Sequence, residues 1–138
     1  MYWCICRVNE FKVLESGSAI VLPGAAPIDI DTSSRTILTQ EIVNQYGMSF
    51  QAALLKLEAA INKNRGASEA SYKVCTFGDW PVQYQLALDA IRLGISLPKA
   101  LTSNLVNLLE LHYENNSSGE PVSTLEELLS ANSLSPVI

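Results

Sequence analysis

Alternation of apolar and polar residues near the start of the chain predicts β-strands. Residues 2–8 are rich in aromatic and β-branched side chains, a polar turn follows at 9–10, and apolar runs occupy 11–14 and 18–22. The pattern predicts a two- or three-stranded antiparallel meander. A connector rich in turn-forming residues follows it, from residue 29 to residue 35.

Two helices are predicted next, each with its own cap. Thr36 or Thr39 begins a short helix that runs through Tyr46, and Gly47 suits the left-handed position after it. Ser49 begins a longer helix. Its large apolar residues recur at intervals of four, three and four and so share one face: Phe50, Leu54, Leu57 and Ile61.

The second half of the chain contains one more predicted strand and further helices. Residues 71–77 alternate as a strand does, and Asp79 can cap a helix over residues 80–93. That helix is apolar on more than one side, so we expect it to be the central helix of the domain. Pro98 begins another helix. Its stripe again follows the spacing four, three and four: Leu101, Leu105, Leu108 and His112.

Together these elements predict an α+β fold. A small N-terminal antiparallel β-meander and one later strand pack against four or five α-helices. Residues 1–116 form the predicted core domain. Residues 117–138 form a linker and a short C-terminal helix, which packs on the core or docks on a partner. Ser123 and Glu126 supply a capping box for that helix.

Charge is unevenly distributed. The net charge is −5, residues 1–99 sum to zero, and the last 39 residues carry five Glu and no Lys or Arg. Proteins that bind phosphates need clustered Lys and Arg, so direct nucleic-acid binding is disfavoured. No apolar run approaches the roughly 18 residues that span a bilayer, and the first residues do not resemble a secretory signal. We expect a cytoplasmic protein that does not contact membranes.

Candidate catalytic and metal-binding groups are few. The default interpretation of the three cysteines is that they are reduced, buried thiols. Cys4, Cys6 and Cys75 with His112 make the count of a Cys₃His zinc site, but the gap of one residue between Cys4 and Cys6 is shorter than usual. Phosphate-binding loops and hydrolase motifs are absent from the sequence. We therefore expect no cofactor and no enzymatic activity, with a small cysteine-dependent enzyme as an alternative.

The remaining features favour binding of another protein. The hypothesis is an accessory or inhibitor protein, of the kind that phages, other mobile elements or toxin–immunity loci encode, whose protein partner has a basic surface. Trp3 and Trp80 are expected in the core. A structural protein that self-associates into a homo-oligomer is the alternative. The predicted contact residues are Tyr84, Glu110, Tyr113, Glu114, Glu126 and Glu127.

Overall fold

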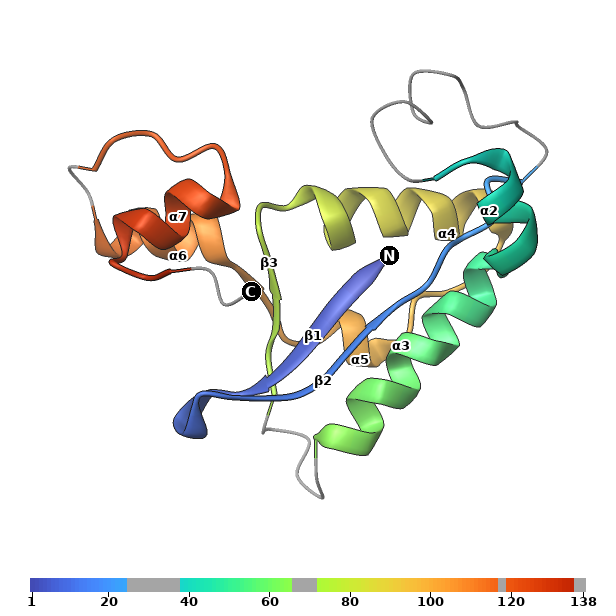
Figure 1. Cartoon of the computed structure of the whole chain (residues 1–138), viewed down its shortest axis with the longest axis horizontal. Helices are drawn as coiled ribbons and strands as arrows, with labels where there is room; N and C mark the ends of the chain where they lie inside the picture. Colours follow the sequence, from blue (N-terminus) through green and yellow to red (C-terminus); the bar gives the residue numbers. More distant parts are fainter. Residues whose placement is uncertain (25–37, 66–71, 117–118, 136–138) are drawn as a thin grey trace. The chain divides into compact units, whose positions relative to one another are not determined.

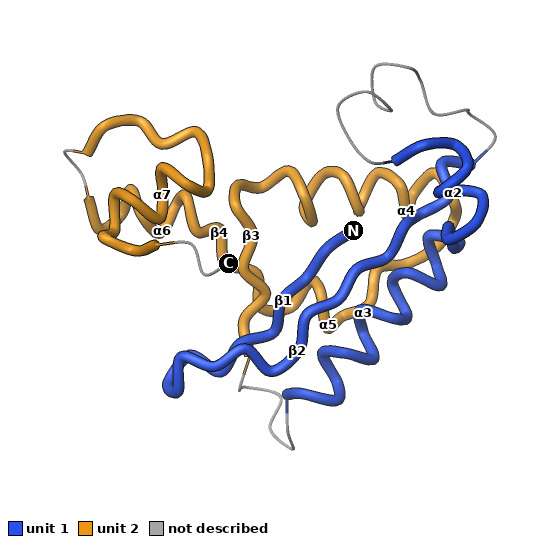
Figure 2. Tube along the Cα trace, in the orientation of Figure 1, with its two compact units in different colours: residues 1–71 blue, residues 72–138 orange. Residues whose placement is uncertain are grey.

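The computed structural model describes residues 1–24, 38–65, 72–116 and 119–135. It groups the chain into two compact units, residues 1–71 and 72–138, shown in Figure 2. The α+β class predicted from the sequence is confirmed. The predicted boundary between a core at 1–116 and a C-terminal segment at 117–138 stays a prediction.

Unit 1 begins with a β-hairpin. Strand β1 (Tyr2–Arg7) pairs antiparallel with β2 (Lys12–Ser18), and a 3-10 turn, η1 (Val8–Glu10), joins them. The turn ends at Phe11, whose φ of 49° lies in the left-handed region that glycine normally occupies. Of the two- and three-stranded meanders that the sequence allowed, the two-stranded one forms. Val21 instead makes an isolated parallel bridge to Met48, so the sheet stays two-stranded.

Two helices complete unit 1 (Figure 1). Thr39 caps α2 (Gln40–Tyr46), and Ser49 caps α3 (Phe50–Asn64) through hydrogen bonds that their side chains accept from backbone N–H groups. The predicted apolar face of α3 is confirmed. Its buried residues are Phe50, Ala53, Leu54, Leu57, Ala60 and Ile61.

Gly47, after α2, does not have the predicted left-handed conformation. Its φ is −68° and its ψ is 143°, which any residue can adopt. Glycine fits this position for another reason: a Cβ there would collide with the carbonyl oxygen of Val43 and the side chain of Leu22. The requirement is space rather than backbone conformation. The predicted connector at 29–35 lies outside the described residues.

Unit 2 contains a pair of short parallel strands. Strand β3 (Val74–Thr76) pairs with β4 (Leu105–Asn107), in the register Val74 with Leu105. Between them lie a π-helix, η3 (Trp80–Leu86), and two α-helices, α4 (Ala87–Leu93) and α5 (Lys99–Thr102). As predicted, a helix ends before Gly94, which takes the left-handed conformation with a φ of 64°.

The predicted helix from Pro98 to His112 is wrong, because two helices and a strand occupy that range. α5 ends after one turn, where the Ser103 hydroxyl donates to the carbonyl oxygen of Lys99. β4 follows, and Asn107 then caps α6 (Leu108–Asn115). The last helix, α7 (Leu125–Ala131), completes unit 2.

Candidate functional site

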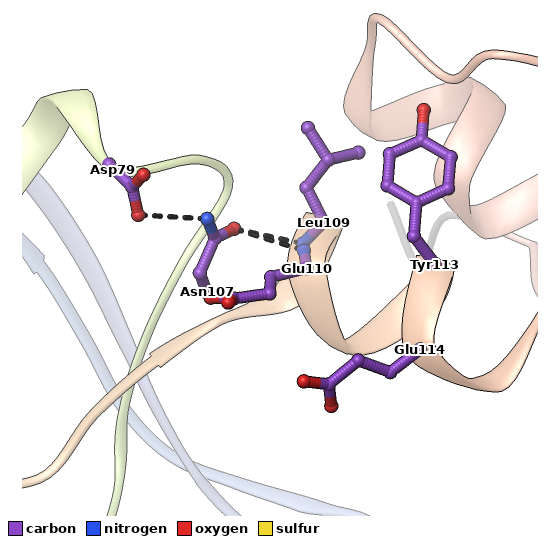
Figure 3. A pocket seen from close by; sticks show the side chains of 6 residues that line it. All are labelled: Asp79, Asn107, Leu109, Glu110, Tyr113 and Glu114. Atoms are coloured by element: carbon purple, nitrogen blue, oxygen red, sulfur yellow. Dashed lines mark hydrogen bonds between the residues drawn. The ribbon is translucent and has the colours of Figure 1, made fainter.

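An open pocket lies where β4 passes into α6 in unit 2. Its volume is about 570 Å³. Figure 3 shows the residues that line it, with Glu110 and Glu114 on one side of α6 and Tyr113 and Leu109 on another. The full lining is Asp79, Asn107, Leu109, Glu110, Tyr113 and Glu114. Three of the six residues predicted for partner binding therefore lie around one pocket: Glu110, Tyr113 and Glu114.

The side chain of Asn107 holds the pocket together. Its Oδ1 accepts from the backbone N–H of Leu109 at 3.0 Å and of Glu110 at 3.4 Å, which caps α6. The same oxygen accepts from the N–H of Gly78 at 3.1 Å, while Nδ2 donates to Asp79 Oδ1 at 2.9 Å. One amide thus joins the end of β3 to the start of α6, and it brings Asp79 beside the two glutamates.

The sequence did not indicate Asp79 and Asn107 as site residues. Asp79 was predicted to cap the helix that follows it, but its side chain makes no capping hydrogen bond to η3. It reaches the pocket only because β3 pairs with β4, whose sequence follows about thirty residues later. No local pattern in the sequence carries that information.

The pocket is acidic. Asp79, Glu110 and Glu114 contribute carboxylates, and no Lys, Arg or His is among the described residues that line it. Glu110 stands in the first turn of α6, where the helix dipole favours a negative charge, but Glu114 stands near the C-terminal end, where it does not. Glu110 and Glu114, one helical turn apart, also repel each other. A cation bound between them would reduce this repulsion and stabilise α6.

Tyr113 connects the pocket to the segment that precedes α7. Its hydroxyl accepts from the N–H of Val122 at 2.8 Å and donates to the carbonyl oxygen of the same residue at 3.4 Å. Tyr113 as a whole is 40% exposed although its hydroxyl is bonded. Tyr113 is therefore a fixed wall of the pocket.

His112, next along α6, is buried and structural. Its Nδ1 accepts from the side-chain amides of Asn116 at 3.3 Å and Asn132 at 3.1 Å. Each of those amides also donates to a carbonyl oxygen of its own helix. The ring thereby ties the end of α6 to the end of α7, where Leu128 is buried.

The two other predicted glutamates have different surroundings. Glu127 belongs to a capping box with Thr124, one residue later than the predicted pair of Ser123 and Glu126. Its carboxylate accepts from the N–H and hydroxyl of Ser123 and from the N–H of Thr124. These bonds, the backbone bond from Ser123 first, hold the pKa of Glu127 below its ordinary value. Glu126 is exposed.

Tyr84 lies on η3, beside an exposed tryptophan. Its ring stacks on Trp80, with 6.1 Å between the ring centroids and 19° between the planes. The fractional exposure is 61% for Trp80 and 52% for Tyr84, so the expected core position of Trp80 is wrong. Leu88 and Ile91 of α4 are also exposed, and the predicted central helix thus carries an open apolar stripe.

The cysteines are not the buried thiols that the sequence led us to expect. Cys4, Cys6 and Cys75 are all free and exposed. Within the described residues, no group of three or more His, Cys, Asp or Glu side chains could hold a metal ion, so the Cys₃His alternative has no support. Desolvation raises the pKa of the Cys75 thiol, and desolvation and the neighbouring thiol of Cys6 raise that of Cys4.

No family profile matches the chain, and no curated protein matches it at a significant level. In the ranges that the structure describes, no helix has the length and apolar character needed to cross a membrane.

Proposed function

We propose that the protein is a cytoplasmic accessory or inhibitor protein, without enzymatic activity, that binds a basic segment of another protein in the acidic pocket of unit 2. One observation carries the proposal: Asp79, Glu110 and Glu114 lie around one open pocket that no basic side chain lines among the described residues. A Lys or Arg of the partner would supply the missing positive charge. Because the three carboxylates are exposed, each such pair contributes about 0.2–1 kcal/mol.

The surroundings of the pocket suit a protein partner better than a small cation. Trp80 directly follows Asp79, and its ring stacks on that of Tyr84 while both stay more than half exposed. Tryptophan and tyrosine are enriched among residues that dominate binding energy at interfaces. Both rings belong to η3, which directly follows the pocket residue Asp79 in the chain, and aromatic side chains are enriched at protein interfaces.

The structure gives no support to the alternative of a cysteine-dependent enzyme. A nucleophilic cysteine needs a lowered pKa, whereas those of Cys4 and Cys75 are raised. The Nδ1 atom of His112, the one histidine in the chain, already accepts two amide hydrogen bonds. These features support a binding role over nucleophilic catalysis.

Affinity capture with charge-reversal variants tests the proposal. The tagged full chain is incubated with lysate of its native host at two salt concentrations, beside Glu110→Lys/Glu114→Lys and the control Glu126→Lys. Glu126 is exposed on α7 and does not line the pocket. We expect one protein to bind the wild type and the control, to dissociate as salt rises, and to bind the double variant about 10- to 100-fold more weakly. Equal capture by all three proteins would refute the role of the pocket.

Self-association is a second candidate, and the hairpin of unit 1 favours it. Among the residues that the structure describes, β1 pairs with β2 alone. The hairpin exposes large apolar side chains, with Val8 at 80% and Phe11 at 96% exposure. Open strand edges with apolar residues pair readily with another copy. Light scattering on the wild type and on Phe11→Ser distinguishes self-association from partner binding. A large assembly that the substitution dissociates supports self-association, and a monomeric wild type excludes it.

A further inference from the structure

The outer face of β1 presents two thiols to each other. Cys4 Sγ and Cys6 Sγ are 3.5 Å apart, and both side chains are exposed. Residues two apart in a strand share one face but normally stand parallel. Here the pairing register with β2 shifts between Ile5 and Cys6, and the irregular backbone accompanies the close approach of the two sulfurs.

Packing does not explain this arrangement. Cysteine is among the most frequently buried residue types, where it acts as a small apolar side chain. The inward positions of β1 belong instead to Trp3 and Ile5, which are partly buried, while Cys4 and Cys6 alternate with them on the exposed face. The two thiols are therefore available to bind a ligand without any change in the core.

We propose that Cys4 and Cys6 together bind one soft, thiophilic metal ion of low coordination number, with Cu(I) as the ion that suits the pair best. Thiolates are the ligands that select soft ions such as Cu(I). Zn²⁺ takes four ligands in structural sites, and no further His, Cys, Asp or Glu joins these two cysteines among the described residues. Cu(I) can be coordinated by two thiolates alone, and the hairpin supplies both of them.

The two sulfurs are close enough to share one ion, but they are closer together than a linear two-coordinate site requires. With metal–sulfur bonds of about 2.3 Å, sulfurs 3.5 Å apart subtend an angle of about 100° at the metal. A linear arrangement would need a separation of about 4.6 Å. Rotation of the exposed side chains about χ1 opens the pair toward that value with no core contact broken. Both thiols release their protons when the ion binds.

A competition titration tests this site. The reduced full chain is titrated anaerobically with Cu(I) in the presence of a chromophoric Cu(I) chelator, and the absorbance reports how much ion the protein removes. Cys4→Ser and Cys6→Ser each delete one ligand. Cys75→Ser is the matched control, because Cys75 is also free and exposed but lies in the other unit. Circular dichroism verifies that each variant is folded.

We expect the wild type and Cys75→Ser to remove one Cu(I) per chain, and each of the other two variants to bind at least about 100-fold more weakly. X-ray absorption of the loaded protein should show two sulfur neighbours. Three results would each overturn the proposal: the wild type leaves the ion with the chelator, a single substitution at Cys4 or Cys6 has no effect, or Cys75→Ser weakens binding equally. A ratio of one ion to two chains would also overturn the assignment to a single hairpin.

Discussion

Gly17 lies directly opposite Trp3 in the hairpin, and we predict that it does not tolerate a side chain. A Cβ at position 17 would lie 2.5 Å from Cζ2, 2.6 Å from Cε2 and 2.8 Å from Nε1 of the indole. Ordinary contact begins at 3.4 Å, so the ring would have to move by about 0.9 Å. An indole is rigid, and therefore the whole side chain has to rotate to make room.

The loss of stability that Gly17→Ala should cause follows from the contacts of the Trp3 ring. Forcing one extra methyl group against a packed side chain costs about 1–3 kcal/mol. Lys56 Nζ lies 5.8 Å from the centroid of the Trp3 ring, and moving the ring would weaken a cation–π contact that contributes about 0.5–1 kcal/mol. Alanine also lowers the conformational entropy of the unfolded chain, which offsets about 0.4–1 kcal/mol of this loss of stability. We expect Gly17→Ala to destabilise the protein by about 1–3 kcal/mol.

Urea unfolding followed by circular dichroism measures this loss. Gly119→Ala is the control, because the nearest atom to a Cβ there is the Asn116 carbonyl oxygen at 3.5 Å, an ordinary contact. We expect that variant to change stability by less than about 0.5 kcal/mol. At roughly 4 °C per kcal/mol, Gly17→Ala should lower Tm by about 4–12 °C.

A double-mutant cycle identifies the cause. In a Trp3→Leu background the ring is absent, so Gly17→Ala should cost little, and the coupling energy should equal most of its effect in the wild type. If the alanine costs as much without the ring as with it, the collision is not the reason for the glycine. If Gly17→Ala leaves the wild type as stable as before, the packing described for the hairpin is wrong.

Three further predictions concern unit 2. Asn107→Ala removes the acceptor that serves Gly78, Leu109 and Glu110 and should lower the free energy of unfolding by about 1–2 kcal/mol, measured by urea denaturation; no loss would show that the amide is not the link between β3 and α6. The folded pKa of Glu127 is below its ordinary value of 4.5, so its stabilising effect is complete above that pH and declines as pH falls through the folded pKa. The protection factors of the α7 amides, which correct exchange rates for the intrinsic effect of pH, should therefore decrease below about pH 4.5 in the wild type. Glu127→Gln should remove this decrease, and equal profiles for the two proteins would contradict the cap. His112→Phe leaves the amides of Asn116 and Asn132 with one unbonded donor each, which should cost about 1–3 kcal/mol, and fast exchange confined to the end of α7 is the expected signature.

Elements with strong local signals were predictable from the sequence. The apolar face of α3 follows from intervals of four, three and four, and Ser49 and Thr39 cap their helices because a hydroxyl satisfies a free N–H at a helix start. Three of the six residues that line the pocket were also named from the sequence, as charged or aromatic contact candidates: Glu110, Tyr113 and Glu114. These signals lie within a few residues of the structure that they specify.

Elements that depend on distant contacts were not predictable. Leu101, Leu105 and Leu108 have helical spacing, yet Leu105 lies in β4, because pairing with β3 supplies hydrogen bonds that outweigh the local preference. Asp79 joins the pocket through the same pairing. The capping box of α7 was misplaced by one residue, since both Ser123 and Thr124 are good caps and only the fold selects Thr124.

The parallel pairing of β3 with β4 also has a kinetic consequence. Val74 and Leu105 must meet across a loop of about thirty residues, and closing such a loop costs roughly 3 kcal/mol of chain entropy. The β1–β2 hairpin closes over a short turn and can form within microseconds. We therefore expect Asn107 to bond to Gly78 and Asp79 at a later step of folding than the hairpin. A nascent chain can have its helices in place while its acidic pocket is still missing, so recognition of a partner would begin only when folding of unit 2 is complete.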